Sequence, residues 1–172
     1  DSAAGGKTTL MSGYSTAQNS GDIRIQTPNA GSSGVSGFII LSTGTASAGS
    51  SGLLAIGTGD ATGGAAGAIS ITVGSGNTGA GGELLLSAGY TTDATTGNSP
   101  TGGSVKLFSG YSSAKSGGDI WIQTANGGTA GVSGMIVMST GATTAGASGG
   151  VYIGSGTATG GAGGSVHVTV GS

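Results

Sequence analysis

The sequence contains no cysteine, and among its 172 residues it has only four basic and six acidic side chains. The absence of cysteine excludes disulfide bonds, thiolate metal sites and cysteine nucleophiles. Four basic residues cannot neutralise the many phosphates that a nucleic acid presents, so we expect no nucleic-acid partner. The composition therefore removes several function classes before any motif is considered.

Long apolar runs are also missing. The runs extend over only a few residues, as in Phe38–Leu41, which is far too short to cross a bilayer, so we expect no membrane span. The chain begins at Asp1 with neither an initiator methionine nor a signal peptide. That start predicts a processed chain or a fragment of a longer one.

Glycine is abundant in the sequence, with 42 of the 172 residues. A glycine content of this size often indicates disorder, but disordered segments also carry high net charge and few β-branched side chains. Here the formal charge is −2, and isoleucine, valine and threonine are plentiful. We therefore expect an ordered chain.

The sequence is repetitive on two scales. A segment of the form Gly-x-apolar-x-apolar occurs eleven times at steps of about 15 residues, and a longer unit repeats after 97 residues, as GDIRIQT at 21–27 and GDIWIQT at 118–124 show. One step is lengthened by an insertion at 90–100, which we expect to leave the repeat as a surface loop. By the 97-residue shift Asp1 corresponds to Asn98, so we expect a fragment of a longer repeat array.

Each segment alternates apolar and polar residues, which is typical of a strand with one buried face. The stretches between segments are too short and too rich in glycine to form crossover helices. Together these features predict an all-β fold, a parallel β-solenoid (β-helix) of about eleven rungs that forms a single segment over 1–172. Glycines at the corners are expected to adopt positive φ.

The inward side chains of such a solenoid should form two continuous buried ladders. The predicted ladder pairs are Ile23/Ile25, Ile39/Leu41, Leu54/Ile56, Ile69/Ile71, Leu84/Leu86, Val105/Leu107, Ile120/Ile122, Ile136/Met138, Val151/Ile153 and Val166/Val168. The terminal rungs at 6–12 and 165–170 carry no caps, so we expect the rod to continue into further repeats or into another copy.

The opposite face of the segments should be polar if water covers it, yet about half of its residues are apolar. Scattered surface hydrophobes are one explanation. An assembly interface is the other, and it would consist of Phe38, Ile40, Leu53, Leu85, Trp121, Met135, Val137 and Tyr152.

Motifs that carry chemistry are scarce. GSGNTG at 74–79 has the spacing of a dinucleotide-binding loop, but no helix pattern follows it. His167 is the only histidine, and the carboxylates are dispersed. No serine or threonine has a His-Asp pair to activate it. We therefore predict no catalytic, cofactor-binding or metal site, and a protein that is not an enzyme.

The stretch TVGSGNTGAGGELLLSAG at 72–89, with TGTASAGSSG and TGGAGGSVHVTVGS elsewhere, resembles the long Gly/Ser/Thr-rich repetitive proteins of stramenopile algae. The resemblance extends over essentially the whole chain and implies a secreted structural protein, such as a component of tubular flagellar hairs (mastigonemes) or of another surface filament. It implies no site residues.

Three function classes follow. A structural building block of an extracellular filament or cell-surface fibre is favoured, with the chain itself as partner and other filament proteins or glycans as further partners. The many serines and threonines also permit O-glycosylation. An ice-binding or surface-adhesive solenoid is the alternative, and it should present a regular outward array of like residues, commonly threonine. The regular threonines of this chain lie on the inward side of the predicted strands, which weakens this alternative: Thr27, Thr43, Thr58, Thr124 and Thr140. A polysaccharide-active enzyme is the third class, and it would need clustered carboxylates, whereas the six acidic residues of this chain are dispersed.

Overall fold

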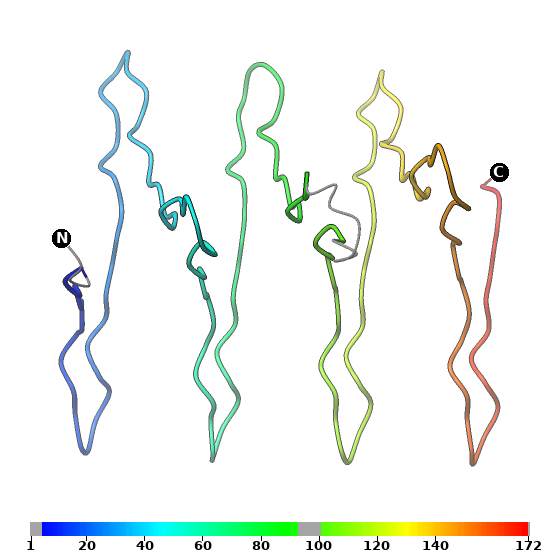
Figure 1. The fold of residues 1–172 in the computed structure, drawn as a ribbon, viewed down its shortest axis with the longest axis horizontal. Helices are drawn as coiled ribbons and strands as arrows, with labels where there is room; N and C mark the ends of the chain where they lie inside the picture. The colour runs from blue at the N-terminus through cyan, green and yellow to red at the C-terminus, as the bar shows by residue number, and fades with distance from the viewer. Residues whose placement is uncertain (1–4, 93–100, 172) are drawn as a thin grey trace. The chain divides into compact units, whose positions relative to one another are not determined.

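A computed structural model describes residues 5–92 and 101–171 of the chain. It divides into two units, Asp1–Leu84 and Leu85–Ser172, which are considered separately. Within the described residues neither unit contains a helix or a strand. Each unit consists of extended segments joined by bends (Figure 1).

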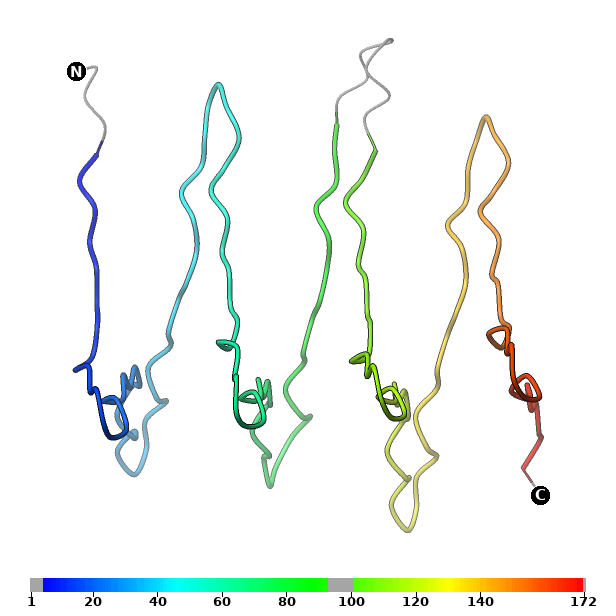
Figure 2. The ribbon, with the colours of Figure 1, turned by 90° about the horizontal axis from the view of Figure 1, so that it is seen from below.

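The bends recur with the spacing of the sequence segments. In the first unit successive bends begin 16, 15, 15 and 15 residues apart, and in the second 16, 15 and 15 residues apart. They lie at 16–18, 32–33, 47–49, 62–64 and 77–79, and at 113–115, 129–131, 144–146 and 159–161. The four bends of the second unit begin 97 residues after the first four bends of the first unit, so the two copies of the long repeat turn at equivalent positions (Figure 2).

The turn at 13–21 is held by two kinds of hydrogen bond. The backbone N–H of Gly21 donates to the carbonyl oxygen of Gly13 over 2.9 Å. Inside the turn, the Ser15 hydroxyl accepts hydrogen bonds from the backbone N–H groups of Ala17 (3.3 Å) and Gln18 (2.9 Å). A serine hydroxyl that bonds the backbone two and three residues onward is a standard device for ordering a bend.

The turn at 110–118 repeats this geometry. Gly118 donates to the carbonyl oxygen of Gly110 over 2.9 Å, and the Ser112 hydroxyl accepts from Ala114 (3.4 Å) and Lys115 (3.0 Å). Equal sequence spacing has therefore produced equal local structure, 97 residues apart.

The predicted β-solenoid is wrong. Where two segments meet across the turns at 13–21 and 110–118, one backbone hydrogen bond joins them, and within the described residues no ladder continues from it. The segments at 6–12 and 165–170, expected to be terminal rungs, are likewise not strands. Alternating apolar residues favour an extended backbone, but a strand exists only when a neighbour pairs with it.

The predicted buried ladders are also wrong, because the described part of the chain contains no buried residue. Ile23 is 49% exposed and Ile25 62% exposed. The other ladder side chains are exposed as well: Ile39, Leu41, Leu54, Ile56, Ile69, Ile71, Leu84, Leu86, Val105, Leu107, Ile120, Ile122, Ile136, Met138, Val151, Ile153, Val166 and Val168. Ordering a chain with 42 glycines has a high entropy cost, and apolar burial does not offset it here.

The positive φ angles expected at the corner glycines are not general. Among the described glycines only Gly79 has a positive φ, of 78°. Glycine is instead required where the chain closes on itself. A Cβ atom on Gly82 would lie 2.8 Å from Cγ1 of Val73, a distance that real Cβ contacts do not reach.

The insertion expected at 90–100 lies largely outside the described residues, which omit 93–100. Its two ends are nevertheless joined, because the backbone N–H of Gly103 donates to the carbonyl oxygen of Gly89 over 2.8 Å. This bond spans 14 residues, whereas the equivalent bond at Gly13 and Gly21 spans eight. The span that this bond closes is therefore six residues longer.

Candidate assembly surface

The eight residues that the sequence indicated as an interface are all exposed, at 68% for Val137 and up to 95% for Tyr152. They belong to extended segments of both units. Phe38, Ile40 and Leu53 lie in the first unit, and Leu85, Trp121, Met135, Val137 and Tyr152 lie in the second.

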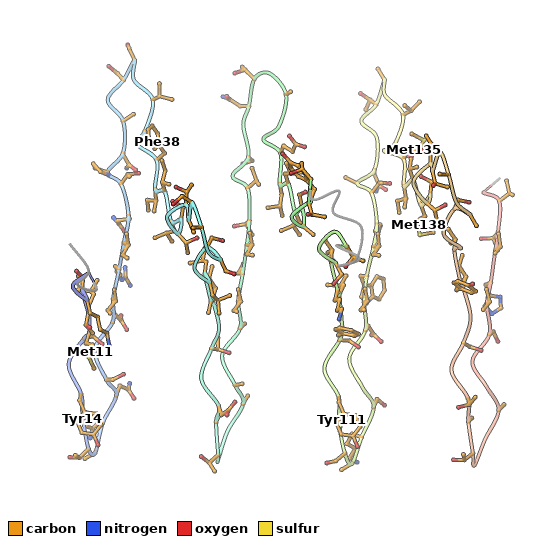
Figure 3. All side chains as sticks on the ribbon, in the orientation of Figure 1. Met11, Tyr14, Phe38, Tyr111, Met135 and Met138 are labelled. Atoms are coloured by element: carbon orange, nitrogen blue, oxygen red, sulfur yellow. The ribbon has the colours of Figure 1, made fainter. Side chains whose placement is uncertain are left out.

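Two of these residues occupy equivalent places in the long repeat. Phe38 follows the turn at 27–37, and Met135 follows the turn at 124–134, as Figure 3 shows. Their exposed fractions are nearly equal, at 83% and 82%. Both copies of the repeat thus present a large apolar side chain directly after this turn.

The opposite side of the segments is not buried either. Ile120 is 48% exposed, whereas its neighbour Trp121 is 82% exposed. Sequence reasoning assigned the side of Ile120 to a core and therefore missed it as accessible surface. Both sides of the extended segments carry apolar side chains that are available to a partner.

An apolar hollow of about 450 Å³ lies in the second unit. Leu86 and Ala88 line it from one extended segment, and Val105 and Leu107 from the next. It lies beside the turn that Gly89 and Gly103 close. The lining is apolar except for Lys106 and two serines, so the hollow offers a further place for an apolar side chain.

The threonine column has a structural role that the sequence did not suggest. The hydroxyls of Thr27 and Thr124 each donate over 3.2 Å to the carbonyl oxygens of Gly37 and Gly134. The side chains of Thr43, Thr58 and Thr140 lie beside Gly52, Gly67 and Gly149, which follow nine residues later. The signal was present as a threonine followed nine or ten residues later by a glycine.

Among the described residues, titratable side chains form no recognisable centre. In the part of the chain that the structure describes, no three His, Cys, Asp or Glu residues could hold a metal ion together. GSGNTG at 74–79 opens no helix, and it includes the bend at 77–79. The same residues include no helix that is long and apolar enough to cross a membrane.

No protein-family model, no curated protein and no solved structure matches this chain.

Proposed function

We propose that the chain is a structural building block of an extracellular filament or cell-surface fibre, and that it assembles with copies of itself through its exposed apolar side chains. One observation carries the proposal. The described residues include no buried side chain, and large apolar residues such as Phe38 and Trp121 are more than four-fifths exposed.

The accessible surface that the single chain offers for assembly is large. The accessible surface is 16907 Å², whereas a folded monomer of this mass exposes about 7,300 Å² and its fully unfolded chain about 22,800 Å². A stable protein interface buries a total of about 1,200–2,000 Å². The surface in excess of a folded monomer is several times larger, and burying apolar area is the main favourable contribution to association.

Charge offers little opposition to self-association. Only 6% of the residues are charged, the formal net charge is −2, and the mean hydropathy is +0.22. A net charge far from zero keeps proteins apart in solution. Copies of this chain therefore repel one another only weakly.

The setting that we propose, outside the cell or on its surface, rests on the resemblance of residues 72–89 to secreted repetitive proteins. Other filament proteins or glycans are further partners in this proposal. The alternative, ice binding or surface adhesion, would require outward threonines in a regular array. The hydroxyls of Thr27 and Thr124 donate to the chain's own backbone, which favours the structural role.

The test is a concentration series of the chain, followed by sedimentation velocity and electron microscopy. We expect a shift from monomer to filaments or large oligomers as concentration rises. The double variant Trp121→Lys/Val137→Lys places two charges among the apolar side chains and should raise the concentration needed for assembly.

A matched control adds the same two charges at polar positions. Gln123→Lys/Ser139→Lys uses the same two segments and the same parity, so it should assemble nearly as the parent chain does. A parent chain that remains monomeric at all concentrations would contradict the proposal. Equal assembly of both double variants would show that the outer apolar side chains are not the interface.

A further inference from the structure

Three of the four tyrosines occupy the same position in a turn. Each directly follows a glycine whose carbonyl oxygen accepts the turn-closing hydrogen bond from a later glycine. Tyr14 follows Gly13, Tyr111 follows Gly110, and Tyr90 follows Gly89. These turns are the ones closed by Gly21, Gly118 and Gly103.

The side chains of these turn tyrosines (Tyr14, Tyr90 and Tyr111) are almost fully accessible. Their exposed fractions are 88%, 88% and 91%. Figure 3 shows Tyr14 at the closed end of its turn, away from Phe38, and Tyr111 at the closed end of its turn, away from Met135. Both the phenol oxygen and the ring carbons beside it are therefore open to a reagent.

Tyr152 differs from the turn tyrosines. It lies on an extended segment, and its ring lies over Gly150, since a Cβ atom added there would be 2.9 Å from Cε2 and 3.2 Å from the hydroxyl oxygen. Cε2 is one of the two ring carbons next to the phenol oxygen. Tyr152 is no less exposed in the single chain, at 95%, but it belongs to the apolar side chains that assembly would cover, so it is the internal control in the assembled chain.

We propose that the turn tyrosines are sites of oxidative cross-linking between copies of the chain, through carbon–carbon coupling of their phenol rings. The inference rests on the proposed assembly, since coupling between copies requires that assembly place their turns side by side. The chain has no cysteine, so disulfide bonds are not available to lock a filament covalently. Three sites per chain would allow a branched network rather than pairs alone.

The reaction balances with a peroxide as oxidant and a haem peroxidase as catalyst. Each of two phenols loses one electron and one proton, which gives two phenoxyl radicals. The radicals form a bond between ring carbons next to the oxygens, and the rings regain aromaticity by moving those two ring hydrogens to the oxygens. One hydrogen peroxide accepts the two electrons and two protons and is reduced to two waters.

The test treats the assembled chain with a haem peroxidase and hydrogen peroxide. Covalent oligomers are measured on a denaturing gel, dityrosine by its fluorescence, and the coupled residues by peptide mass spectrometry. The triple variant Tyr14→Phe/Tyr90→Phe/Tyr111→Phe should lose the covalent oligomers and most of the fluorescence, whereas Tyr152→Phe should retain both. Undiminished coupling in the triple variant, or coupling that needs Tyr152, would overturn the inference.

Assembly is measured separately, by sedimentation before the oxidant is added, so the two proposals can fail independently. A chain that does not assemble contradicts the proposed function. A chain that assembles, but forms no dityrosine between copies, contradicts the cross-linking inference alone. Formation of dityrosine through the turn tyrosines in the assembled chain, and loss of it in the triple variant, supports the inference.

Discussion

Thr27 and Gly37 close a turn between them. The Thr27 Oγ1 donates to the carbonyl oxygen of Gly37 over 3.2 Å, and its Cγ2 lies 3.1 Å from where a Cβ on residue 37 would be. Thr124 and Gly134 form the same arrangement, with an equal hydrogen-bond length. The threonine hydroxyl therefore holds the glycine carbonyl, and the absence of a side chain on the glycine leaves room for the threonine methyl group.

Replacing Thr27 with valine tests the hydroxyl's share of this contact. Thr27→Val keeps the branched shape but removes the donor, so the turn should lose about 0.5–1 kcal/mol of stability, as a hydrogen bond near the surface contributes. Nuclear Overhauser effects between the methyl of residue 27 and the Hα of Gly37 would weaken. Thr27→Ser keeps the donor and should keep the turn; equal effects for the two variants would contradict this role.

Adjacent glycines at 81 and 82 should respond differently to alanine. A Cβ on Gly82 would lie 2.8 Å from Cγ1 of Val73, and β-branched valine has little freedom to turn away. Gly82→Ala should therefore open the turn between Val73 and residue 82, with loss of their contacts in NMR spectra. A Cβ on Gly81 meets nothing within 4 Å, so Gly81→Ala should leave the turn closed. Comparable spectra for the two variants would argue against this explanation.

The sequence allowed the spacing of the segments to be predicted but not their pairing. Glycines flank the bends at 16–18 and 113–115, which contain no glycine themselves and occupy equivalent places in the two repeats. The alternation of Ile23, Arg24 and Ile25 favours an extended backbone. It carries no information about which neighbour, if any, would supply the hydrogen bonds of a ladder.

The same limitation affected the candidate surface. Alternation assigned Trp121 to an outer face and Ile120 and Ile122 to a core, but all three are exposed, at 82%, 48% and 67%. The alternation of residues along an extended segment distinguishes its two sides, but it does not indicate whether either side is buried. Because the described residues form no core, both sides of the segment belong to the accessible surface.

Shortening the insertion should leave its turn intact. The bond from Gly103 to Gly89 spans six residues more than the bond from Gly21 to Gly13. Removing six residues between 92 and 101 should reduce the entropy cost of closing the turn by about 0.5 kcal/mol. Amide exchange at Gly103 should become slower or stay unchanged. Faster exchange, or loss of ordered protein, would mean that the insertion has a structural role.

Trp121 provides a direct reporter of assembly because it is the only tryptophan and is 82% exposed in the single chain. At low concentration its emission should be that of a solvated indole. Assembly through the outer apolar side chains should shift the emission to shorter wavelength and reduce quenching by acrylamide, since the indole would leave water.

Exchanging the two repeat positions tests whether the two units meet different neighbours. Arg24 occupies the place of Trp121 97 residues earlier, so the variant Arg24→Trp/Trp121→Arg keeps the composition and moves the reporter. If Trp121 lies in an interface and Arg24 faces water, the exchange should raise the concentration needed for assembly, and the moved indole should remain accessible to acrylamide. An equal emission shift and equal assembly in the exchanged chain would show that the two positions are equivalent and that Trp121 has no specific partner surface.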